Sequence, residues 1–148
     1  MLVKNQRVVF LLLSVGLYLL SLTQTALPGY LGWEVLLFGW LGIFQTIANT
    51  TWIANVTLLA SWIANITSER VVAVSLSVIT VVVAAVFLVC KNIIMGEDGT
   101  LRPIEGYFLG YWLWLASMIT ALVSALLKAS PDKPNNAFKA DVAKATRP

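Results

Sequence analysis

Charge is absent from long parts of this chain, and three of the apolar runs have the length of a membrane span. They cover residues 8–26, 71–90 and 106–127. A helix of roughly 20 apolar residues crosses the hydrocarbon core of a bilayer. Residues 71–90 are rich in valine, which favours strands in water, but an uncharged run of this length without turn residues is typical of a membrane helix. The pattern therefore predicts three transmembrane helices.

A fourth apolar region, residues 35–66, does not have the length of a simple span. It contains 32 uncharged residues. As one helix they would extend about 48 Å, which is too long for one upright crossing and barely enough for two. The hydrophobic pattern alone leaves both one crossing and two crossings open.

The distribution of lysine and arginine separates these two topologies. With one crossing the basic residues divide eight to two, and with two crossings they divide four to six. In the first case the eight are Lys4, Arg7, Arg70, Lys128, Lys133, Lys139, Lys144 and Arg147, and the two are Lys91 and Arg102. Basic residues concentrate on the cytoplasmic side of membrane proteins. We therefore expect four spans, with both termini in the cytoplasm and the loop 91–105 outside.

One crossing can absorb the long region if its helix is interrupted. The short polar side chains of Ala-Asn-Thr-Thr, residues 48–51, can bond to the backbone and weaken a helix there. We expect a short helix at 32–47, lying in the outer interface or re-entering the membrane, and a crossing at 48–67. Tyr30 and Trp33 suit the level of the lipid headgroups.

The predicted fold class is an all-α polytopic membrane protein with a short interfacial or re-entrant helix and four transmembrane helices, at about 8–26, 48–67, 71–90 and 106–127. Residues 1–128 form a single transmembrane domain. Residues 129–148 form a disordered basic cytoplasmic tail that can touch anionic headgroups. A cleaved signal peptide is the alternative for the first run. Its small-x-small cleavage pattern fits poorly, because cleavage after Ala26 would put Gln24 at the third position back.

The sequence Trp-Ile-Ala-Asn occurs twice, at residues 52–55 and 62–65. Both copies, and Asn49 before them, read as Asn-x-Thr glycosylation acceptors, but a glycan cannot be attached within a membrane helix. Each tryptophan lies three residues before its asparagine, so the two share a helix face. The offset of the copies is about 2.8 turns, which rotates the second pair by about 80°. We expect Trp62 near the cytoplasmic interface and Trp52 deeper, with a buried partner for its N–H.

The asparagines are the strongest polar signal in the predicted spans. A carboxamide in hydrocarbon is costly unless it is bonded, so Asn55, at mid-depth, should bond to another helix. Such a bond contributes about 0.6–2 kcal/mol. We expect Asn65 at the end of the same helix and Asn49 within reach of the interface. The functional alternative is that Gln45, Asn49 and Asn55 line a wet cavity or a ligand site.

Small residues recur on one face of the last predicted span. They are Gly106, Gly110, Ser117, Ala121 and Ser124. The span at 71–90 carries a similar set, Ala73, Ser77, Thr80 and Ala84. Small residues let membrane helices approach closely. We expect these two faces to pack against each other within one chain, with a homodimer contact as the alternative.

Composition restricts the chemistry. Of the 148 residues, 59% are hydrophobic and 11% are charged, whereas soluble domains have about 25% charged residues. The absence of histidine and the single cysteine, Cys90, exclude Cys/His metal clusters, a disulfide within the chain and the usual acid/base group near neutral pH. The net charge is +3, and the basic residues flank apolar segments. They therefore indicate membrane topology rather than nucleic-acid binding. We expect no enzymatic activity, no cofactor and no metal site.

The segment Gly-Tyr-Phe-Leu-Gly-Tyr-Trp-Leu-Trp at 106–114, together with Trp-x-Ala-Asn, resembles a set of small bacterial inner-membrane proteins without an assigned activity. Their pattern has Trp-x-Ala-Asn-Pro before the second span and Gly-Tyr-x-Leu-Trp near the start of the last. Here Val56 replaces that proline, and residues 111–114 match the second motif only approximately. The resemblance covers residues 29–127 loosely. It implies the same topology and a bacterial inner membrane, with no chemistry to transfer.

No Asp, Glu, Lys, Arg or His lies within the four predicted spans. Proton-coupled transporters normally carry such residues inside the membrane. We therefore predict a non-enzymatic accessory, assembly or immunity-type subunit that acts through helix contacts. Its expected partners are the lipid bilayer and another membrane protein or a second copy of itself. The alternative is an oligomeric channel or transporter subunit for neutral solutes or ions.

Overall fold

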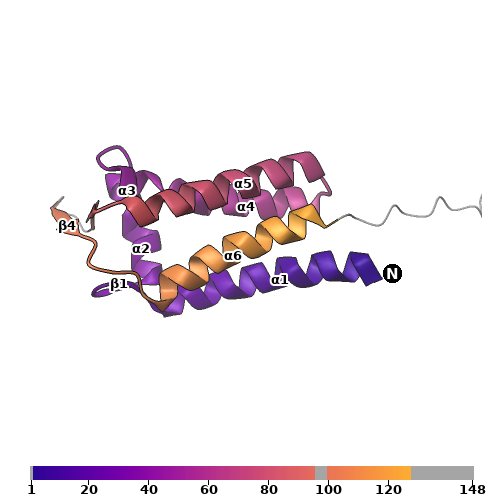
Figure 1. Ribbon diagram of the computed structural model, residues 1–148, viewed down its shortest axis with the longest axis horizontal. Helices are drawn as coiled ribbons and strands as arrows, with labels where there is room; N and C mark the ends of the chain where they lie inside the picture. The colour runs from indigo at the N-terminus through magenta and orange to yellow at the C-terminus, as the bar shows by residue number, and fades with distance from the viewer. Residues whose placement is uncertain (1, 96–99, 128–148) are drawn as a thin grey trace, which may run out of the picture.

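Four long helices form an antiparallel bundle in the computed structural model, which describes residues 2–95 and 100–127. They are α1 (Leu2–Thr23), α4 (Ile53–Ile66), α5 (Arg70–Val86) and α6 (Leu109–Leu126). α1 and α5 run in one direction and α4 and α6 in the other, so α1 begins and α6 ends at the same end of the bundle (Figure 1). The predicted tail 129–148 and the acidic residues Glu97 and Asp98 lie outside the described residues.

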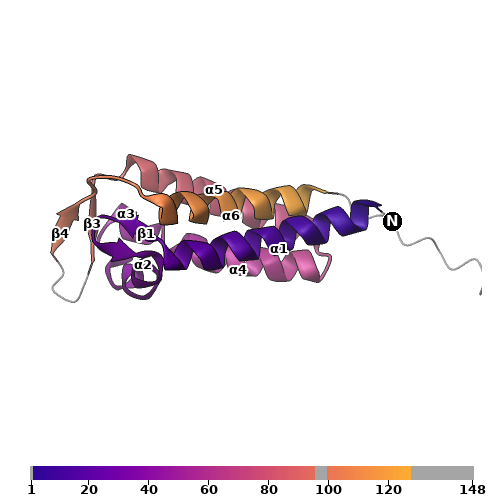
Figure 2. The ribbon, with the colours of Figure 1, turned by 90° about the horizontal axis from the view of Figure 1, so that it is seen from below.

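The connections at the opposite end form a cap of short elements. They are β1 (Thr25–Leu27), β2 (Tyr30–Leu31), α2 (Gly32–Phe38), the 3-10 helix η1 (Gly39–Gly42), α3 (Ile47–Thr50), the 3-10 helix η2 (Phe87–Val89), β3 (Asn92–Ile94) and β4 (Leu101–Pro103). The strands form two antiparallel hairpins, β1–β2 and β3–β4. Figures 1 and 2 show these elements together at one end of the bundle. We call residues 32–46 the elbow.

Three helices of the described residues are long and apolar enough to cross a membrane. They are Gln6–Thr23, Arg70–Val89 and Leu109–Leu126. α4 has only 14 residues, fewer than the roughly 20 that span a bilayer. Its outward face is nevertheless wholly aliphatic, with Ile53, Val56, Leu59, Ile63 and Ile66 exposed. The predicted helical fold is therefore present, with three spans assigned by length and composition.

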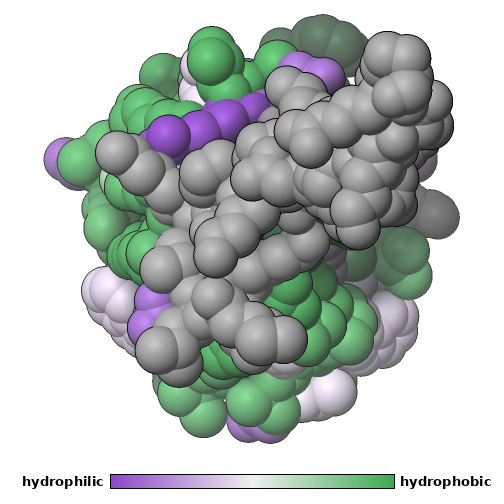
Figure 3. All heavy atoms as spheres, turned by 90° about the vertical axis from the view of Figure 1, so that its right-hand side faces the viewer, coloured by the Kyte–Doolittle hydropathy of each residue, from purple (hydrophilic) through white to green (hydrophobic). Residues whose placement is uncertain are grey.

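Polarity is distributed as in a protein surrounded by lipid. The buried polar side chains are Ser14, Ser21, Asn49, Thr51, Asn55, Ser61, Asn65, Ser77, Thr80, Ser117 and Ser124. Large apolar side chains face outward instead; Leu12 and Ile63, for example, are each 64% exposed. In the end-on view of Figure 3, hydrophobic atoms make up much of the visible described surface. A domain folded in water buries its large aliphatic side chains more often than its polar ones.

α6 is the central helix of the bundle. It packs against α1 along its length and also against α5, while α4 packs against α5. Figure 2 shows α6 between α1 and α5. The core cluster contains Tyr18, Ala54, Leu58, Ala84, Met118 and Ala121. Three of these six are alanines, which let the helices approach closely without a hydrophobic driving force between them.

α5 and α6 pack against each other as predicted, but at the centre of the two small-residue faces Ser117 and Thr80 bond to other helices. Ser117 lies against α1, because the Ser14 hydroxyl donates a 2.7 Å hydrogen bond to the Ser117 carbonyl. Thr80 lies against α4 and donates a 2.7 Å bond to the hydroxyl of Thr57. Ala84 and Ala121 do share the core cluster. A stripe of small residues shows that a neighbour comes close, but it does not identify the neighbour.

Two of the predicted helices extend too far, because the β1–β2 hairpin and its contacts occupy the positions of their predicted ends. Residues 24–26 leave the helix where Pro28 and Gly29, with a φ of +78°, turn the chain back so that β1 pairs with β2. Gly106 lies outside α6, since residues 104–108 are not helical. The amide of Phe108 instead donates a 3.1 Å bond to the carbonyl of Ala26. The hairpin therefore replaces the last turn of one predicted span and the first turn of another.

The predicted break at residues 48–51 is present, and it divides the helix predicted at 48–67. α3 ends at Thr50, Thr51 and Trp52 form a turn, and α4 begins at Ile53. The Thr46 hydroxyl caps α3 by accepting a 3.1 Å bond from the amide of Asn49. The single helices predicted at 32–47 and 48–67 are thus each divided, the first into α2 and η1 and the second into α3 and α4.

Two glycines in long helices provide a matched test of this packing. A Cβ added at Gly110 would lie 2.8 Å from the carbonyl oxygens of Gln24 and Thr25, whereas one added at Gly16 would meet nothing within 4 Å. We expect Gly110→Ala to lower the yield of folded protein and its thermal stability in detergent, because the obstacle is backbone. Gly16→Ala should be neutral or slightly stabilising, since alanine favours helix. Equal stability of the two variants would show that the hairpin does not press on α6.

Candidate functional site

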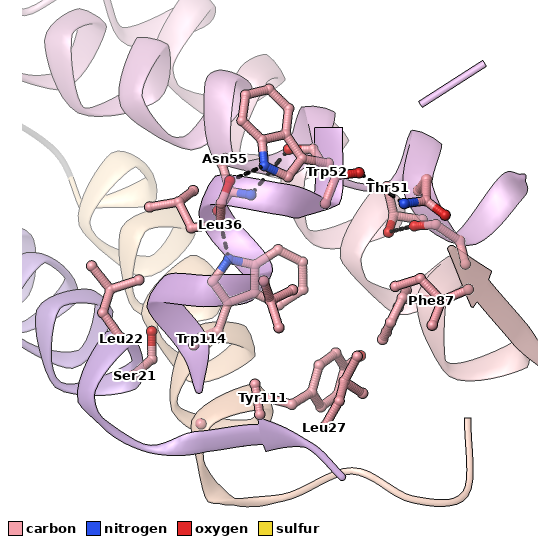
Figure 4. A pocket seen from close by; sticks show the side chains of 18 residues that line it. Ser21, Leu22, Leu27, Leu36, Thr51, Trp52, Asn55, Phe87, Tyr111 and Trp114 are labelled. Atoms are coloured by element: carbon pink, nitrogen blue, oxygen red, sulfur yellow. Dashed lines mark hydrogen bonds between the residues drawn. The ribbon is translucent and has the colours of Figure 1, made fainter. Parts of the chain in front are cut away.

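The carboxamide of Asn55 joins three helices. Its oxygen accepts a 3.2 Å bond from the hydroxyl of Tyr18 on α1 and a 2.8 Å bond from the indole N–H of Trp114 on α6. Its nitrogen donates a 3.1 Å bond to the carbonyl of Trp52. Figure 4 shows the Trp114 indole directed at Asn55. Asn55 therefore connects α4 to both α1 and α6.

Asn65, in the second copy of the repeat, joins the same three helices near the other end of the bundle. Arg7 on α1 donates a 2.6 Å bond from Nε to the Asn65 side-chain oxygen and a second bond to the Asn65 carbonyl. The Asn65 nitrogen donates a 3.0 Å bond to the Ser124 hydroxyl, which donates a 2.9 Å bond to the Arg7 carbonyl. These bonds form a closed ring through α1, α4 and α6.

Trp62 adds a connection between the levels of the two asparagines. Its indole N–H donates a 3.0 Å bond to the Ser14 hydroxyl, which in turn bonds to the backbone of Ser117. The rings of Tyr18 and Trp62 meet edge to face at 5.5 Å. The two copies are rotated relative to each other, yet each asparagine has one side-chain partner on α1 and one on α6. The repeat is therefore a set of interhelical connections.

Asn49 holds the cap together. Its nitrogen donates 2.8 Å bonds to the carbonyls of Gly39 and Ile94, and its oxygen accepts from the Ile94 amide at 2.9 Å and the Thr46 hydroxyl at 2.6 Å. Asn49 is 1% exposed, so the expectation that it reaches the interface is wrong. The reason is Gly42, where a Cβ would lie 2.7 Å from the Asn49 side chain. This glycine lets the elbow close over the carboxamide.

The elbow has three backbone carbonyls that are bonded by side chains from the residues following it. The Trp52 indole donates to the Leu36 carbonyl at 2.8 Å, and the Thr50 hydroxyl donates to the Ile43 carbonyl at 2.7 Å. The third is the bond from Asn49 to Gly39 described above. A side chain on α3 or in the turn before α4 thus satisfies a carbonyl in each part of the elbow. The buried partner expected for the Trp52 N–H is the Leu36 carbonyl.

A cavity of about 70 Å³ lies between the elbow and the bundle. Its lining comes from α1, β1, α2, η1, α3, α4, η2, β3 and α6, and includes the aromatic residues Trp52, Phe87, Tyr111 and Trp114 (Figure 4). Most of its polar groups are already bonded within the protein. The Ser21 hydroxyl donates to the Tyr18 carbonyl at 2.6 Å, and the Thr51 hydroxyl donates to the Ala48 carbonyl at 2.6 Å. The cavity is therefore an apolar space with aromatic walls.

The structure brings some of the predicted site residues together and separates others. Asn49 and Asn55 both line the cavity, and so does Gly110. Gln45 is exposed in the elbow and does not line the cavity. Ser117 and Ala121 lie in the helix interface, and Asn65 lies at the far end of the bundle.

The partners of the asparagines could not be identified from the sequence. Tyr18, Trp114, Arg7 and Ser124 lie in other helices, at separations of 37 to 59 residues along the chain from the asparagine each one contacts. A tyrosine and a serine inside apolar runs indicate that a polar partner is needed, without specifying which. No protein-family model, curated protein or solved structure matches the chain.

Removing the Asn55 carboxamide should leave two buried donors, the Tyr18 hydroxyl and the Trp114 indole N–H, without an acceptor. We expect Asn55→Leu to lower the free energy of unfolding by about 1–3 kcal/mol. Equilibrium unfolding in mixed detergent–dodecyl sulfate micelles measures this change. Val56→Leu is the matched control, because Val56 is the next residue and is 50% exposed on the outward face.

A double-mutant cycle isolates the bond itself. Trp114→Phe removes the indole donor, so Asn55→Leu should cost less in that background than in the wild type. Additive effects of the two substitutions would show that the 2.8 Å contact between them contributes no stability.

Proposed function

We propose that this protein is a four-span subunit of the bacterial inner membrane that acts without catalysis, as an accessory, assembly or immunity-type protein. Both termini lie in the cytoplasm. It works through helix contacts with another membrane protein. The observation that carries the proposal is that the interior side chains of Asn55, Asn65 and Trp62 bond to other helices.

The fourth span consists of α3, the turn and α4. Residues 47–66 together have the roughly 20 residues that a crossing requires, although the turn interrupts them. The outward face of α4 is aliphatic, as expected for contact with lipid. α4 runs antiparallel to both α1 and α5, which puts the start of α1 and the end of α6 at one end (Figure 1). That arrangement is the one favoured by the distribution of lysine and arginine.

A fifth span in the elbow has little support from the geometry. α2 has 7 residues and η1 has 4, far fewer than the roughly 20 of a span. Trp40, Phe44 and Ile47 expose 52%, 99% and 70% of their surface. Apolar side chains exposed on short elements suit a segment that enters the outer leaflet and leaves on the same side.

The bonding of the interior polar groups favours a structural role for this protein over a channel function. Asn55, Asn65 and Trp62 bond to side chains of other helices, so they are not available to coordinate a passing solute. An oligomeric pore would instead need polar outward faces. Those of α4 and α5 carry large aliphatic residues, among them Val56, Ile63 and Val82. The assignment to a bacterial inner membrane rests on the resemblance of residues 29–127.

Topology can be measured with reporter fusions. A fusion at residue 148 should be active only for a cytoplasmic reporter, and one at Gly99 only for a periplasmic reporter. Placing the same two reporters at Ser68, between α4 and α5, provides the control, since that loop should be cytoplasmic. Periplasmic signals at both Ser68 and residue 148 would contradict the four-span topology and support five spans, because two spans separate these positions in either topology.

Purification in a mild detergent tests the proposed role. We expect a second membrane protein to co-purify in constant stoichiometry, and a four-span protein of unrelated sequence with the same tag to lack it. A homo-oligomer that purifies without a partner and conducts ions in liposomes would support the channel alternative instead.

A further inference from the structure

The cavity beneath the elbow has the chemistry of a site for a hydrocarbon chain. A stable water in a cavity needs roughly two to four polar partners. The Trp52 and Trp114 indoles already donate to Leu36 and Asn55, and the Tyr111 hydroxyl donates to the Ala84 carbonyl at 3.1 Å. A polar ligand would therefore find few groups to bind, whereas an apolar one would meet aromatic and aliphatic walls.

The size of the cavity distinguishes between shapes of apolar ligand. Its volume is about 70 Å³. An apolar cavity of about 150 Å³ is known to accept benzene. A space of half that volume is too small for an aromatic ring, but it can take a few carbons of a linear chain. The volume thus favours a chain end over a ring.

The surroundings of the cavity are apolar as well. Leu22 on α1 and Leu36 on α2 line the cavity and are half-buried, so they lie between it and the surface. Next to them Leu19, Leu20 and Leu37 are 49–58% exposed. An irregular backbone tolerates hydrocarbon only where its polar groups are satisfied internally. Side chains satisfy three carbonyls of the elbow, as described above, so the elbow is suited to lie against lipid chains.

We propose that this cavity receives the end of a lipid acyl chain from the surrounding bilayer. No hydrophobic driving force exists for a chain that leaves one hydrocarbon environment for another. The gain is dispersion, because an empty space leaves the side chains that line it without contacts on one side. The site goes beyond the proposed role, since it requires only that the cap lies in the membrane.

Photo-crosslinking tests the proposal directly. The full chain is reconstituted in phosphatidylcholine vesicles containing a phosphatidylcholine with a diazirine at the terminal carbon of one acyl chain. The isomer with the diazirine beside the carbonyl is used in parallel. After illumination, mass spectrometry locates the adducts. We expect the terminal diazirine to label residues lining the cavity, among them Leu22, Leu36 and Trp114, and the carbonyl-proximal isomer to label them much less.

Cavity-filling variants provide the control. Ala26 and Ala48 both line the cavity, and Ala26 lies in a strand, where valine is favourable. Ala26→Val and Ala48→Val should each lower labelling inside the cavity roughly threefold or more, because the added methyl groups occupy the space. Ala85→Val adds the same groups on the exposed face of α5 and should leave the labelling unchanged.

Three results would overturn the proposal. One is labelling of outward-facing residues only, with none in the cavity of the wild type. Another is preferential labelling by the carbonyl-proximal isomer. The third is cavity labelling that neither valine substitution reduces in folded protein. The wild-type pattern decides the matter even if both variants fail to fold, and none of these results depends on whether a protein partner co-purifies.

Discussion

A carboxamide in hydrocarbon must find its hydrogen-bond partners inside the protein, because no water is present to replace them. In this bundle that constraint decides which helices lie together. Asn55 needs donors for its oxygen, and Tyr18 and Trp114 each need an acceptor, so all three are satisfied by meeting at one point. At the far end Asn65, Arg7 and Ser124 satisfy one another in the same way. Alanine and serine between these two levels let the helices come close, but the polar groups determine the arrangement.

The same constraint extends to the backbone of the cap. The elbow contains a short helix, a 3-10 turn and a loop, and such a backbone leaves carbonyls without helical partners. Asn49, Thr50 and Trp52 satisfy three of them, and these residues come immediately after the elbow. The polar residues at the break between α3 and α4 therefore have a second role, because their side chains bond back to the elbow.

The features that could be predicted from the sequence alone are those that depend on amino-acid composition and on the length of the apolar runs. The apolar runs, the interruption near Thr50 and the need of Asn55 for a partner all follow from lengths and side-chain chemistry. The first hairpin was missed because Thr25 and Ala26 read as a continuation of the apolar run, although Pro28 and Gly29 follow. The helices that contact Ser117 and Thr80 could not be predicted, because a face of small residues allows any neighbouring helix to pack closely against it. The burial of Asn49 depends on Gly42 and Ile94, which lie in separate parts of the chain.

The cavity is a consequence of how the elbow is held. Side chains that pack only by apolar contact can slide until a void closes, because such contacts have no preferred direction. The elbow is instead fixed by the bonds of Asn49 to Gly39 and of Trp52 to Leu36, which set distances of 2.8 Å at two points. Below it, the Trp114 indole is fixed by its own bond to Asn55. Directional bonds hold both the elbow and the Trp114 indole, so neither can move toward the other. The space between them therefore persists, and a lipid chain can fill it.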